Sequence, residues 1–418
     1  MVTLPETMPL DVVGLRADFP ILAQRIHGDK PLVFLDNAAS TQRPRQVIEA
    51  IVHLYEHDYA NVHRGIHYLS ERCTDLYEQS REKIRAFVNA PSAEQVIFTS
   101  GTTAGINTVA RSWGDANLRA GDEILLSVME HHSNLVPWHQ LAERTGAVVR
   151  HIPITDDGLL ELDALDGLLT DRTRLVAITA VSNVLGTVNP LETIIARAHA
   201  VGAVVLVDAA QQVPRMPVDV TALDVDFLTF SGHKMVGPSG IGVLYGKREL
   251  LEAMPPFLGG GSMINEVKLD RFTPAELPAK FEAGTPPIAP AIALGTAVDY
   301  LSAVGLEAIH QYEALLVAHA HDVLAEVGDV RILGPDLAHK TGIVSFTIDR
   351  IHAHDVAQVV DRYGVAIRAG HHCTQPLHER LGIGASCRAS FYFYNTLEEV
   401  DRLGEALRET KRVFRRRR

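Results

Sequence analysis

Short apolar runs alternate with amphipathic segments through the middle of the chain, and this alternation constrains the fold more than any other feature. Runs rich in valine, isoleucine and leucine occur at residues 124–127, 148–152, 175–181, 204–207, 227–230 and 241–245. Such runs are typical of strands that are buried on both faces of a sheet. Between several of them, apolar residues recur at helical spacing, at 44–59, 135–145 and 191–201. The sequence therefore predicts an α/β domain around a mostly parallel sheet.

The pattern changes where three prolines fall within residues 286–290. Beyond this segment, a long helical stretch precedes strand-like and helix-like segments at 341–347, 355–363 and 365–368. A chain of 418 residues can build two domains, each with its own core. We therefore expect a large domain over residues 26–299 and a smaller α+β domain formed by residues 1–25 and 300–418.

Charge and cysteine content exclude several classes of function. A net charge of −12 argues against a nucleic-acid surface, and we interpret the basic residues at 411–418 as a solvated helix end. Three widely spaced cysteines do not make a disulfide framework, which favours a reducing compartment. The N-terminal residues lack the pattern of a signal peptide, and no apolar run is long enough to span a membrane. We expect a cytoplasmic protein that binds neither nucleic acid nor membrane.

A lysine directly follows one of the predicted strands. The segment SGHK at 231–234 comes after an apolar run and before a glycine-rich stretch at 237–242. A lysine in such a loop can lie in a pocket, where burial favours the neutral amine that forms Schiff bases. Taken alone, Lys234 would more often be a surface charge.

Two further segments could hold parts of a cofactor. Asp208 ends the run VVLVD at 204–208, and its carboxylate is either a helix cap or a partner for a pyridinium nitrogen. The segment FTSGTTAGIN at 98–107 predicts a strand, a glycine turn and a helix start, where backbone N–H groups and hydroxyls can bind an anion. An ordinary capped helix is the alternative. A P-loop is excluded because no lysine follows the second glycine.

The order of these three segments resembles that of the fold-type I enzymes, which use pyridoxal 5′-phosphate (PLP). Three more segments, NVHRGIH at 61–67, EHHSN at 130–134 and RAGHHC at 368–373, resemble the SufS-like (group II) cysteine desulfurases. The resemblance covers residues 18–395. It implies a fold-type I PLP-dependent transferase, with a mostly parallel seven-stranded sheet in the large domain and the catalytic cysteine loop in the smaller α+β domain. It also implies a homodimer with sites at its interface.

The resemblance implies a role for each matching residue. Lys234 would bind PLP covalently, Cys373 would receive the sulfur, and His131 would stack on the cofactor ring and relay protons. Asp208 would pair with the ring nitrogen, and Gln211 would contact the ring oxygen. The remaining cofactor contacts would come from Thr102, Thr103, Asn183, Ser231, His233 and, in the neighbouring subunit, Thr285. The substrate would be bound by Asn183, Arg368 and Arg388.

Cys373 also has a physical case of its own. A nucleophilic cysteine needs access and thiolate character. Arg368, His371 and His372 lie within the five residues before it, and we expect nearby positive charge to favour the thiolate. By contrast, Cys73 recurs at helical spacing with apolar residues and is predicted to be a small core residue.

The histidines do not predict a metal site. Neighbouring histidines, as in His131-His132 and His371-His372, point to opposite sides of an extended chain, so they rarely ligate one ion. His354 is a separate case. In SufS-like enzymes that work with a zinc-containing acceptor of SufU type, the resemblance implies that a histidine in this segment engages the acceptor's zinc. The alternative is a plain residue at a helix start.

The expected activity is that of a cysteine desulfurase. L-Cysteine would become L-alanine, with its sulfur captured as a persulfide on Cys373 and passed to an acceptor of SufE or SufU type for iron–sulfur cluster assembly. The nearest alternative is a selenocysteine lyase or cysteine sulfinate desulfinase on the same scaffold. An aminotransferase has no use for the loop cysteine, and an inactive scaffold is disfavoured because every matched position holds a competent residue. Thr374 departs from the family pattern, in which alanine is common, and adds a hydroxyl beside the thiol.

Overall fold

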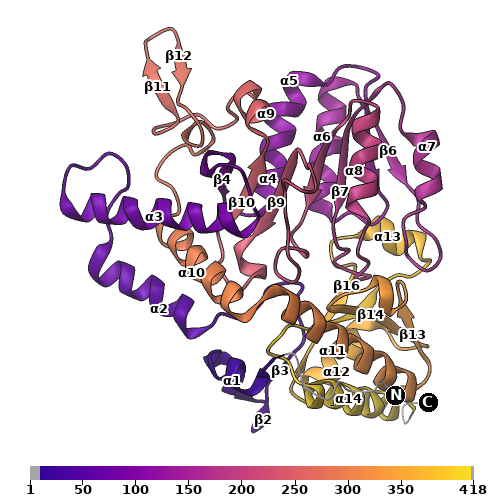
Figure 1. Cartoon of the computed structure of the whole chain (residues 1–418). Helices are drawn as coiled ribbons and strands as arrows, with labels where there is room; N and C mark the ends of the chain where they lie inside the picture. The colour runs from indigo at the N-terminus through magenta and orange to yellow at the C-terminus, as the bar shows by residue number, and fades with distance from the viewer. Residues whose placement is uncertain (1–9, 416–418) are drawn as a thin grey trace.

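The main sheet of the molecule has seven strands (Figure 1). The computed structural model describes residues 10–415. The strands of this sheet are β4 (Val96–Thr99), β5 (Glu123–Ser127), β6 (Val148–Ile152), β7 (Thr173–Thr179), β8 (Val204–Asp208), β9 (Phe227–Ser231) and β10 (Gly242–Gly246). They lie in the order β4-β10-β9-β8-β7-β5-β6. Strand β10 runs in the direction opposite to that of the other strands, which are all parallel to one another. The predicted α/β fold with a mostly parallel seven-stranded sheet is confirmed.

Strand β7 shows that both faces of this sheet are covered. Leu175 and Ala177 point into one apolar core, while Val176 and Ile178 point into a second. This alternation of faces is the period of a strand, and it explains why the run is apolar at every position. The helices that contribute to the first core are α4 (Thr102–Val109), α6 (Val136–Thr145) and α9 (Arg248–Ala253). Those that contribute to the second include α3 (Tyr68–Phe87), α8 (Leu191–Ala200) and α10 (Ile288–Val304).

Strand β6 departs from the expectation of a strand buried on both faces. Of its five residues, Ile152 alone is buried, whereas every residue of β5 is buried. The reason is position, because β6 lies at the edge of the sheet and pairs only with β5. Arg150 of β6 remains partly exposed and reaches Glu123 of β5 at 3.1 Å.

A second, smaller sheet lies below the first in Figure 1. Its order is β13-β14-β17-β16, and all its pairings are antiparallel. The elements of this part of the chain are β13 (Val330–Leu333), β14 (Ile343–Ile348), β16 (Arg368–Gly370), β17 (Ser386–Ser390), α11 (Leu306–Val327), α12 (Ala353–Asp361), α13 (Gln375–Arg380) and α14 (Leu397–Arg415). Helix α14 includes the first residues of the basic C-terminal segment, and residues 416–418 lie outside the described part of the chain.

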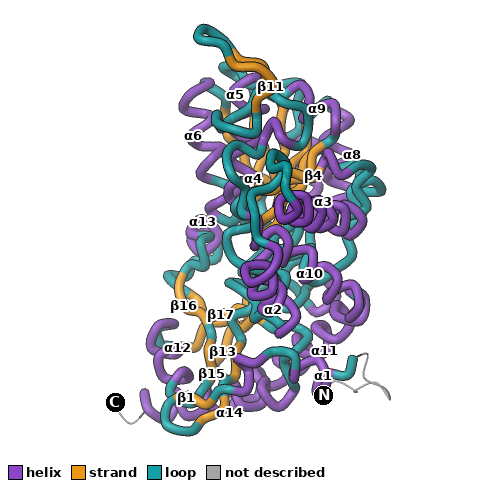
Figure 2. The backbone as a smooth tube through the Cα atoms, turned by 90° about the vertical axis from the view of Figure 1, so that its left-hand side faces the viewer, coloured by secondary structure: helices purple, strands orange, loops and turns teal. Residues whose placement is uncertain are grey.

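The N-terminal segment packs beside this smaller sheet (Figure 2). Strand β3 (Val33–Phe34) pairs in parallel with β15 (Val365–Ala366), and the ring centroids of Phe19 and Tyr394 lie 4.5 Å apart. The remaining elements are short: α1 (Val12–Ala17), α2 (Arg45–His53), α5 (Asp115–Asn117), α7 (Leu165–Leu168), β1 (Arg25–Ile26), β2 (Lys30–Pro31), β11 (Ile264–Val267) and β12 (Phe272–Pro274). The domain limits after residues 25 and 299 stay a prediction.

Helices α10 and α11 are long and rich in apolar residues. Among residues 10–415, no single helix is long and apolar enough to cross a membrane. These two helices pass that test only as a pair, and the pair is bent by 73°. Many of their residues are buried in the protein core.

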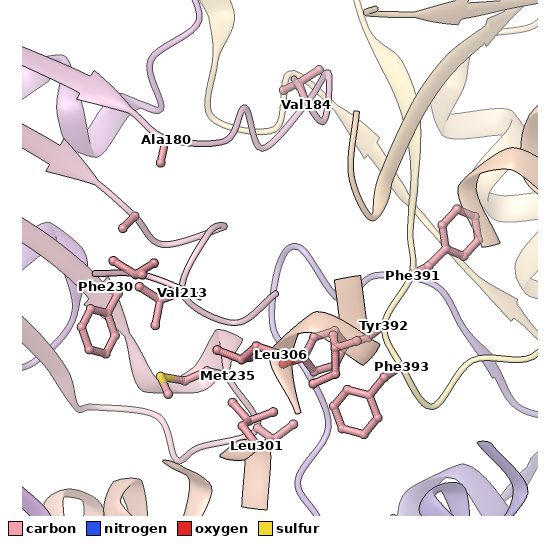
Figure 3. Packing of buried hydrophobic residues seen from close by; sticks show 14 of the residues in the cluster. Ala180, Val184, Val213, Phe230, Met235, Leu301, Leu306, Phe391, Tyr392 and Phe393 are labelled. Carbon is pink, nitrogen blue, oxygen red and sulfur yellow. The ribbon is translucent and has the colours of Figure 1, made fainter. Parts of the chain in front are cut away.

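Buried side chains fill the junction between the two sheets (Figure 3). Phe230 comes from β9, and Tyr392 comes from the segment that follows β17. The same junction holds an ion pair of 2.6 Å between Arg215 and Glu313, whose side chains are 1% and 0% exposed. Arg215 also lies over the Tyr392 ring and donates a hydrogen bond to the Phe391 carbonyl at 3.0 Å. This guanidinium therefore joins three separate segments of the chain.

Removing one partner of this ion pair is expected to destabilise the protein strongly. Glu313→Leu leaves Arg215 buried without its counter-charge, and the free energy of unfolding is expected to fall by about 3–5 kcal/mol. The double variant Arg215→Met/Glu313→Leu is expected to lose less than the single variant, because no unpaired charge remains. Chemical denaturation measures both.

Lys83→Met is the matched control for the ion-pair variants. Lys83 pairs with Asp299 at the surface, where both side chains are about half exposed, and its loss is expected to cost about 1 kcal/mol or less. A double variant that loses as much stability as Glu313→Leu would contradict this explanation of the buried pair.

Candidate active site

A cavity of about 180 Å³ lies where the parallel strands of the main sheet end. Thr179, Asp208 and Ser231 are the last residues of β7, β8 and β9, and all three line the cavity. This edge is where open α/β sheets bind their ligands. Every predicted site residue except Thr285 lines the cavity, namely Thr102, Thr103, His131, Asn183, Asp208, Gln211, Ser231, His233, Lys234, Arg368, Cys373 and Arg388.

Lys234 ends a tight turn that follows β9. The turn is closed by a hydrogen bond of 3.0 Å from the Met235 backbone N–H to the Gly232 carbonyl, and the Gly232 N–H donates to the Ile241 carbonyl at 3.0 Å. A Cβ at Gly232 would lie 2.9 Å from the Ile241 side chain, so the turn requires a glycine there.

Within residues 10–415 the Lys234 amine has no hydrogen bond or ion pair. Burial lowers the pKa of Lys234 to about 8, although the Asp208 carboxylate opposes this shift. Far more of this amine is therefore neutral at physiological pH than of an ordinary lysine, and the neutral amine is the form that attacks an aldehyde.

Asp208 supplies the carboxylate that acts on this amine. It is buried at the end of β8, and it accepts a hydrogen bond of 3.0 Å from the Ala210 backbone N–H. The carboxylate thus caps a turn and also lines the cavity. Burial raises the pKa of Asp208, while Lys234 and the Ala210 bond oppose the rise. Gln211 follows in the same turn and donates to the Ala38 carbonyl at 2.7 Å.

The start of α4 forms the end of the cavity that suits an anion. Gly101 precedes the helix with a φ of 144°, and Ser231 lies against the first turn. The Ser231 hydroxyl accepts from the Thr102 backbone N–H at 2.8 Å and lies 2.7 Å from the Thr102 hydroxyl. Burial, followed by the Lys234 charge, lowers the pKa of His233 to about 4, so this imidazole is neutral at physiological pH. Helix-start N–H groups and hydroxyls are the donors that bind phosphates.

His131 lines the cavity as a neutral imidazole. Burial, followed by the Lys234 charge, lowers the pKa of His131 to about 3. Its Nδ1 accepts from the Ser133 backbone N–H at 3.1 Å and lies 2.8 Å from the Ser133 hydroxyl. Because Nδ1 is an acceptor, the single proton of the neutral ring is on Nε2.

Glu130 was given no role by the sequence, yet it anchors the turn that bears His131. It is 1% exposed and accepts hydrogen bonds from the Ser127 hydroxyl at 2.5 Å, the Thr179 N–H at 3.0 Å and the Asn134 amide at 2.6 Å. Burial raises the pKa of Glu130 to about 8. The available signal was an acidic residue three positions after strand β5, with no basic residue except histidines beside it in sequence.

Arg388 and Asn183 meet at the floor of the cavity. Arg388 is 2% exposed, and its two terminal nitrogens donate to the Asn183 carbonyl at 2.9 Å and to Asp36 at 3.0 Å. Its Nε has no partner within the described residues. Burial lowers the pKa of Arg388 to about 10, so the guanidinium stays charged at physiological pH. Arg368 of β16 lies opposite Arg388 of β17 in the register of these two antiparallel strands. Asp36 is a site contact that the sequence did not indicate, because only the fold brings it to β17.

The surroundings of Cys373 correct one expectation about charge. Cys373 is exposed, as predicted, and Cys73 and Cys387 are buried. His372, however, is buried, and burial followed by the charge of Arg388 lowers its pKa to about 2. It therefore contributes no positive charge to favour the Cys373 thiolate. The sequence places the two residues side by side but does not show which of them is inside.

Thr285 lies outside the cavity, as a residue that serves a neighbouring subunit would. It is exposed and follows Glu282, which is held against β4 by a buried arginine. Arg81 donates to both Glu282 oxygens, at 2.6 and 2.9 Å, and the Phe98 N–H donates to the same carboxylate at 2.7 Å. The role of Thr285 across a dimer interface stays a prediction.

The cavity residues match the three reactive parts of one cofactor. A partly buried amine without a hydrogen bond or ion pair suits an aldehyde, a buried carboxylate that lines the cavity suits a pyridine nitrogen, and a helix start suits a phosphate. An open α/β sheet that carries the α4 N-terminus, Asp208 and Lys234, in this order along the chain, defines a PLP-dependent enzyme of fold type I.

Comparison with known proteins places the chain within this class. Residues 33–403 match the family model "Aminotransferase class-V". The chain is 53% identical to a protein of Synechocystis sp. named "Probable cysteine desulfurase", covering 97% of each. It is 53% identical to the cysteine desulfurase of Enterobacter sp., covering 96% of this chain and 98% of that one. The crystal structure of the cysteine desulfurase CsdA from Escherichia coli is 41% identical, with a TM-score of 0.90, and the match covers 96% of this chain and 99% of that one. The chain belongs to the aminotransferase class-V family, among its cysteine desulfurases.

The low pKa of Lys234 predicts how the apoprotein takes up its cofactor. The rate of PLP attachment is expected to rise with pH and to level off above about pH 8, where the amine is neutral, instead of near the ordinary lysine value of 10.5. Asp208→Asn removes a negative charge that raises the pKa of Lys234, so the midpoint is expected to move to lower pH. Stopped-flow absorbance of apoprotein mixed with PLP measures both. A midpoint near 10 in the unsubstituted protein would contradict the burial argument.

Glu130→Gln tests the anchor beneath His131. The glutamine NH₂ would face the Asn134 amide, which cannot turn over because its oxygen accepts from Trp138 at 2.9 Å. One buried donor is then unpaired, and the free energy of unfolding is expected to fall by about 1–3 kcal/mol. Chemical denaturation measures the loss, with Glu379→Gln at an exposed position as the control. Equal stability of the two variants would show that Glu130 does not anchor the turn.

Proposed function

We propose that this protein is a cysteine desulfurase that converts L-cysteine to L-alanine and holds the sulfur as a persulfide on Cys373. The observation that carries the proposal is an exposed cysteine on a loop that lines the same cavity as Lys234. Bound PLP would act as a sink for the electrons released at the substrate Cα. An aminotransferase would need the same cofactor residues but not this thiol.

The cationic floor of the cavity would hold the substrate carboxylate. Arg388 stays charged when buried, and its free Nε is a donor that the protein leaves unused. A charged hydrogen bond of this kind is strong and directional. Asn183 donates to the His372 carbonyl at 2.8 Å, so the residue beside the carboxylate site is also tied to the cysteine loop. Binding of the carboxylate would therefore orient the substrate sulfur toward that loop.

Lys234 is better suited than His131 to remove the Cα proton. The burial-lowered pKa of Lys234 allows a neutral amine that can accept a proton. His131 already carries its proton on Nε2, since Nδ1 accepts from Ser133, and its low pKa disfavours a second proton. In this scheme His131 holds a proton at Nε2 and can donate it, whereas Lys234 takes the Cα proton.

The sulfur step needs no external oxidant or reductant. The Cys373 thiolate would attack the substrate sulfur, forming the S–S bond as the C–S bond breaks. The substrate carbon would keep the electron pair of the broken bond and take up a proton, so that L-alanine leaves. The sulfur atom would stay on Cys373 as a persulfide.

An acceptor protein would then collect the sulfur. Cys373 is exposed, and an acceptor of SufE or SufU type, serving iron–sulfur cluster assembly in the cytoplasm, fits a thiol in that position. His354 supports the SufU-type alternative, because it is exposed at the start of α12 and a Cβ at Gly370 would lie 3.8 Å from its Nε2. We further propose that the enzyme works as a homodimer, in which Thr285 contacts the cofactor of the neighbouring subunit.

Alanine formation from L-cysteine in the presence of a reductant tests the proposed function. Unsubstituted protein is expected to release alanine and sulfide, whereas Cys373→Ala and Lys234→Ala are expected to lose at least about 100-fold in rate, because each removes a group that reacts. Cys387→Ala is the control, since that thiol is buried and burial raises its pKa to about 12. If Cys373→Ala made alanine at the full rate, the protein would be a lyase that does not use the loop thiol.

A further inference from the structure

The loop that bears Cys373 has an unfavourable backbone conformation. His372 and Cys373 have φ angles of 51° and 58°, and Gly370 has a φ of 127°. Residues with a side chain lose about 1–2 kcal/mol each in the left-handed region. Two such residues in succession persist only where the surroundings hold them in place.

His132 provides two of the contacts that hold this loop. Its backbone N–H donates to the Cys373 carbonyl at 2.8 Å. Its Nε2 accepts from the Gln375 backbone N–H at 3.1 Å. His132, which lies in a loop of the main sheet, thus binds the chain at Cys373 and at Gln375, on either side of Thr374.

The opposite side of the loop is held by different groups. Asn183 donates to the His372 carbonyl, and the His372 and His378 rings lie 3.0 and 2.9 Å from the Ser386 hydroxyl. His378 Nδ1 lies 3.1 Å from the Thr374 carbonyl. Apart from the Asn183 bond, these contacts come from the smaller sheet and α13, so they would move together with the loop. The His132 contacts, like the Asn183 bond, tie the loop to the main sheet.

The side-chain contact of His132 specifies which of its ring nitrogens carries the proton. The Gln375 N–H is a donor, so Nε2 of His132 must be unprotonated and the proton of the neutral ring is on Nδ1. Burial, followed by the charge of His371, lowers the pKa of His132 and favours this neutral form. A side chain at this position therefore needs an acceptor atom at the place of Nε2.

We propose that His132 is a positioning residue that latches the Cys373 loop to the turn bearing His131, so that the thiol is held within reach of the substrate sulfur. The inference rests on the proposed function, because it concerns the placement of the attacking thiol. His132 is adjacent to His131 in sequence, so the residue that handles a proton and the residue that places the nucleophile share one turn. Displacement of an attacking atom by about 1 Å can cost on the order of 10²-fold in rate, which makes such a latch consequential.

His132→Ala and His132→Gln separate the latch from a merely structural role. His132→Ala removes the acceptor but keeps the backbone bond to Cys373, whereas the glutamine side chain offers an amide oxygen to the Gln375 N–H. Gln375→Pro removes the donor from the other side and leaves His132 intact, at a first helical position that tolerates proline. Two measurements are made on PLP-loaded protein: hydrogen exchange of the segment 370–377, and kcat and KM for L-cysteine.

The latch predicts a pattern across both measurements. In His132→Ala and Gln375→Pro, exchange of 370–377 is expected to rise about tenfold and kcat to fall about tenfold, with KM little changed, since a lost hydrogen bond is worth about that factor. His132→Gln is expected to restore both. The cofactor absorption and the exchange of strand β5 are expected to stay as in the unsubstituted protein.

Two results would overturn the latch. Unchanged exchange of 370–377 in both His132→Ala and Gln375→Pro would show that the loop is held without this contact. Equal impairment of His132→Gln and His132→Ala would show that the ring, and not an acceptor atom, is needed. Failure of the unsubstituted protein to form alanine would count against the proposed function alone, because the exchange of the loop tests the latch without any turnover.

Discussion

The active-site cavity is organised around one partly buried amine at the carboxyl edge of the parallel sheet. Lys234 lies just beyond the end of β9, where the Asp208 carboxylate that ends β8 acts on its charge, but the amine has no hydrogen bond or ion pair among residues 10–415. An unpaired buried ammonium is costly, so the protein shifts the amine toward its neutral form. That shift in pKa prepares the lysine to bind an aldehyde.

Burial also keeps several of the titratable side chains in the cavity neutral at physiological pH. The imidazoles of His131, His233 and His372 are all kept neutral, because burial lowers each pKa well below the ordinary histidine value. Arg388 remains cationic at physiological pH, which makes it the natural partner of a substrate carboxylate. Protons are thus held at defined atoms, and the groups that move them differ from those that bind the substrate. The Cys373 thiol gains no positive charge from His372, so its reactivity depends on placement more than the sequence indicated.

Residues whose surroundings are set by their neighbours in sequence could be predicted best. The strands and the residues that end them could be predicted because the apolar run and the residue that ends it are adjacent in sequence. Asp208 and the turn of Lys234 are the two examples. The family resemblance then supplied the residues that line the cavity. What could not be predicted depends on contacts between distant segments. Strand β6 is half exposed because it lies at the sheet edge, and Asp36 meets Arg388 only through the pairing of the N-terminal segment with the smaller sheet. Side-chain burial in the loop was also hidden, since His371 and His372 look alike in sequence but only the latter is inside.

In the proposed reaction, sulfur leaves L-cysteine by transfer to Cys373. The most direct test is to add less than one equivalent of L-cysteine carrying a heavy sulfur isotope to the PLP-loaded protein, without reductant. The protein is then alkylated and digested, and its cysteine peptides are analysed by mass spectrometry. We expect one heavy sulfur atom on the peptide that contains Cys373, and none on the peptides of Cys73 and Cys387. Heavy sulfide released into solution with an unmodified Cys373, or label on either buried cysteine, would contradict it.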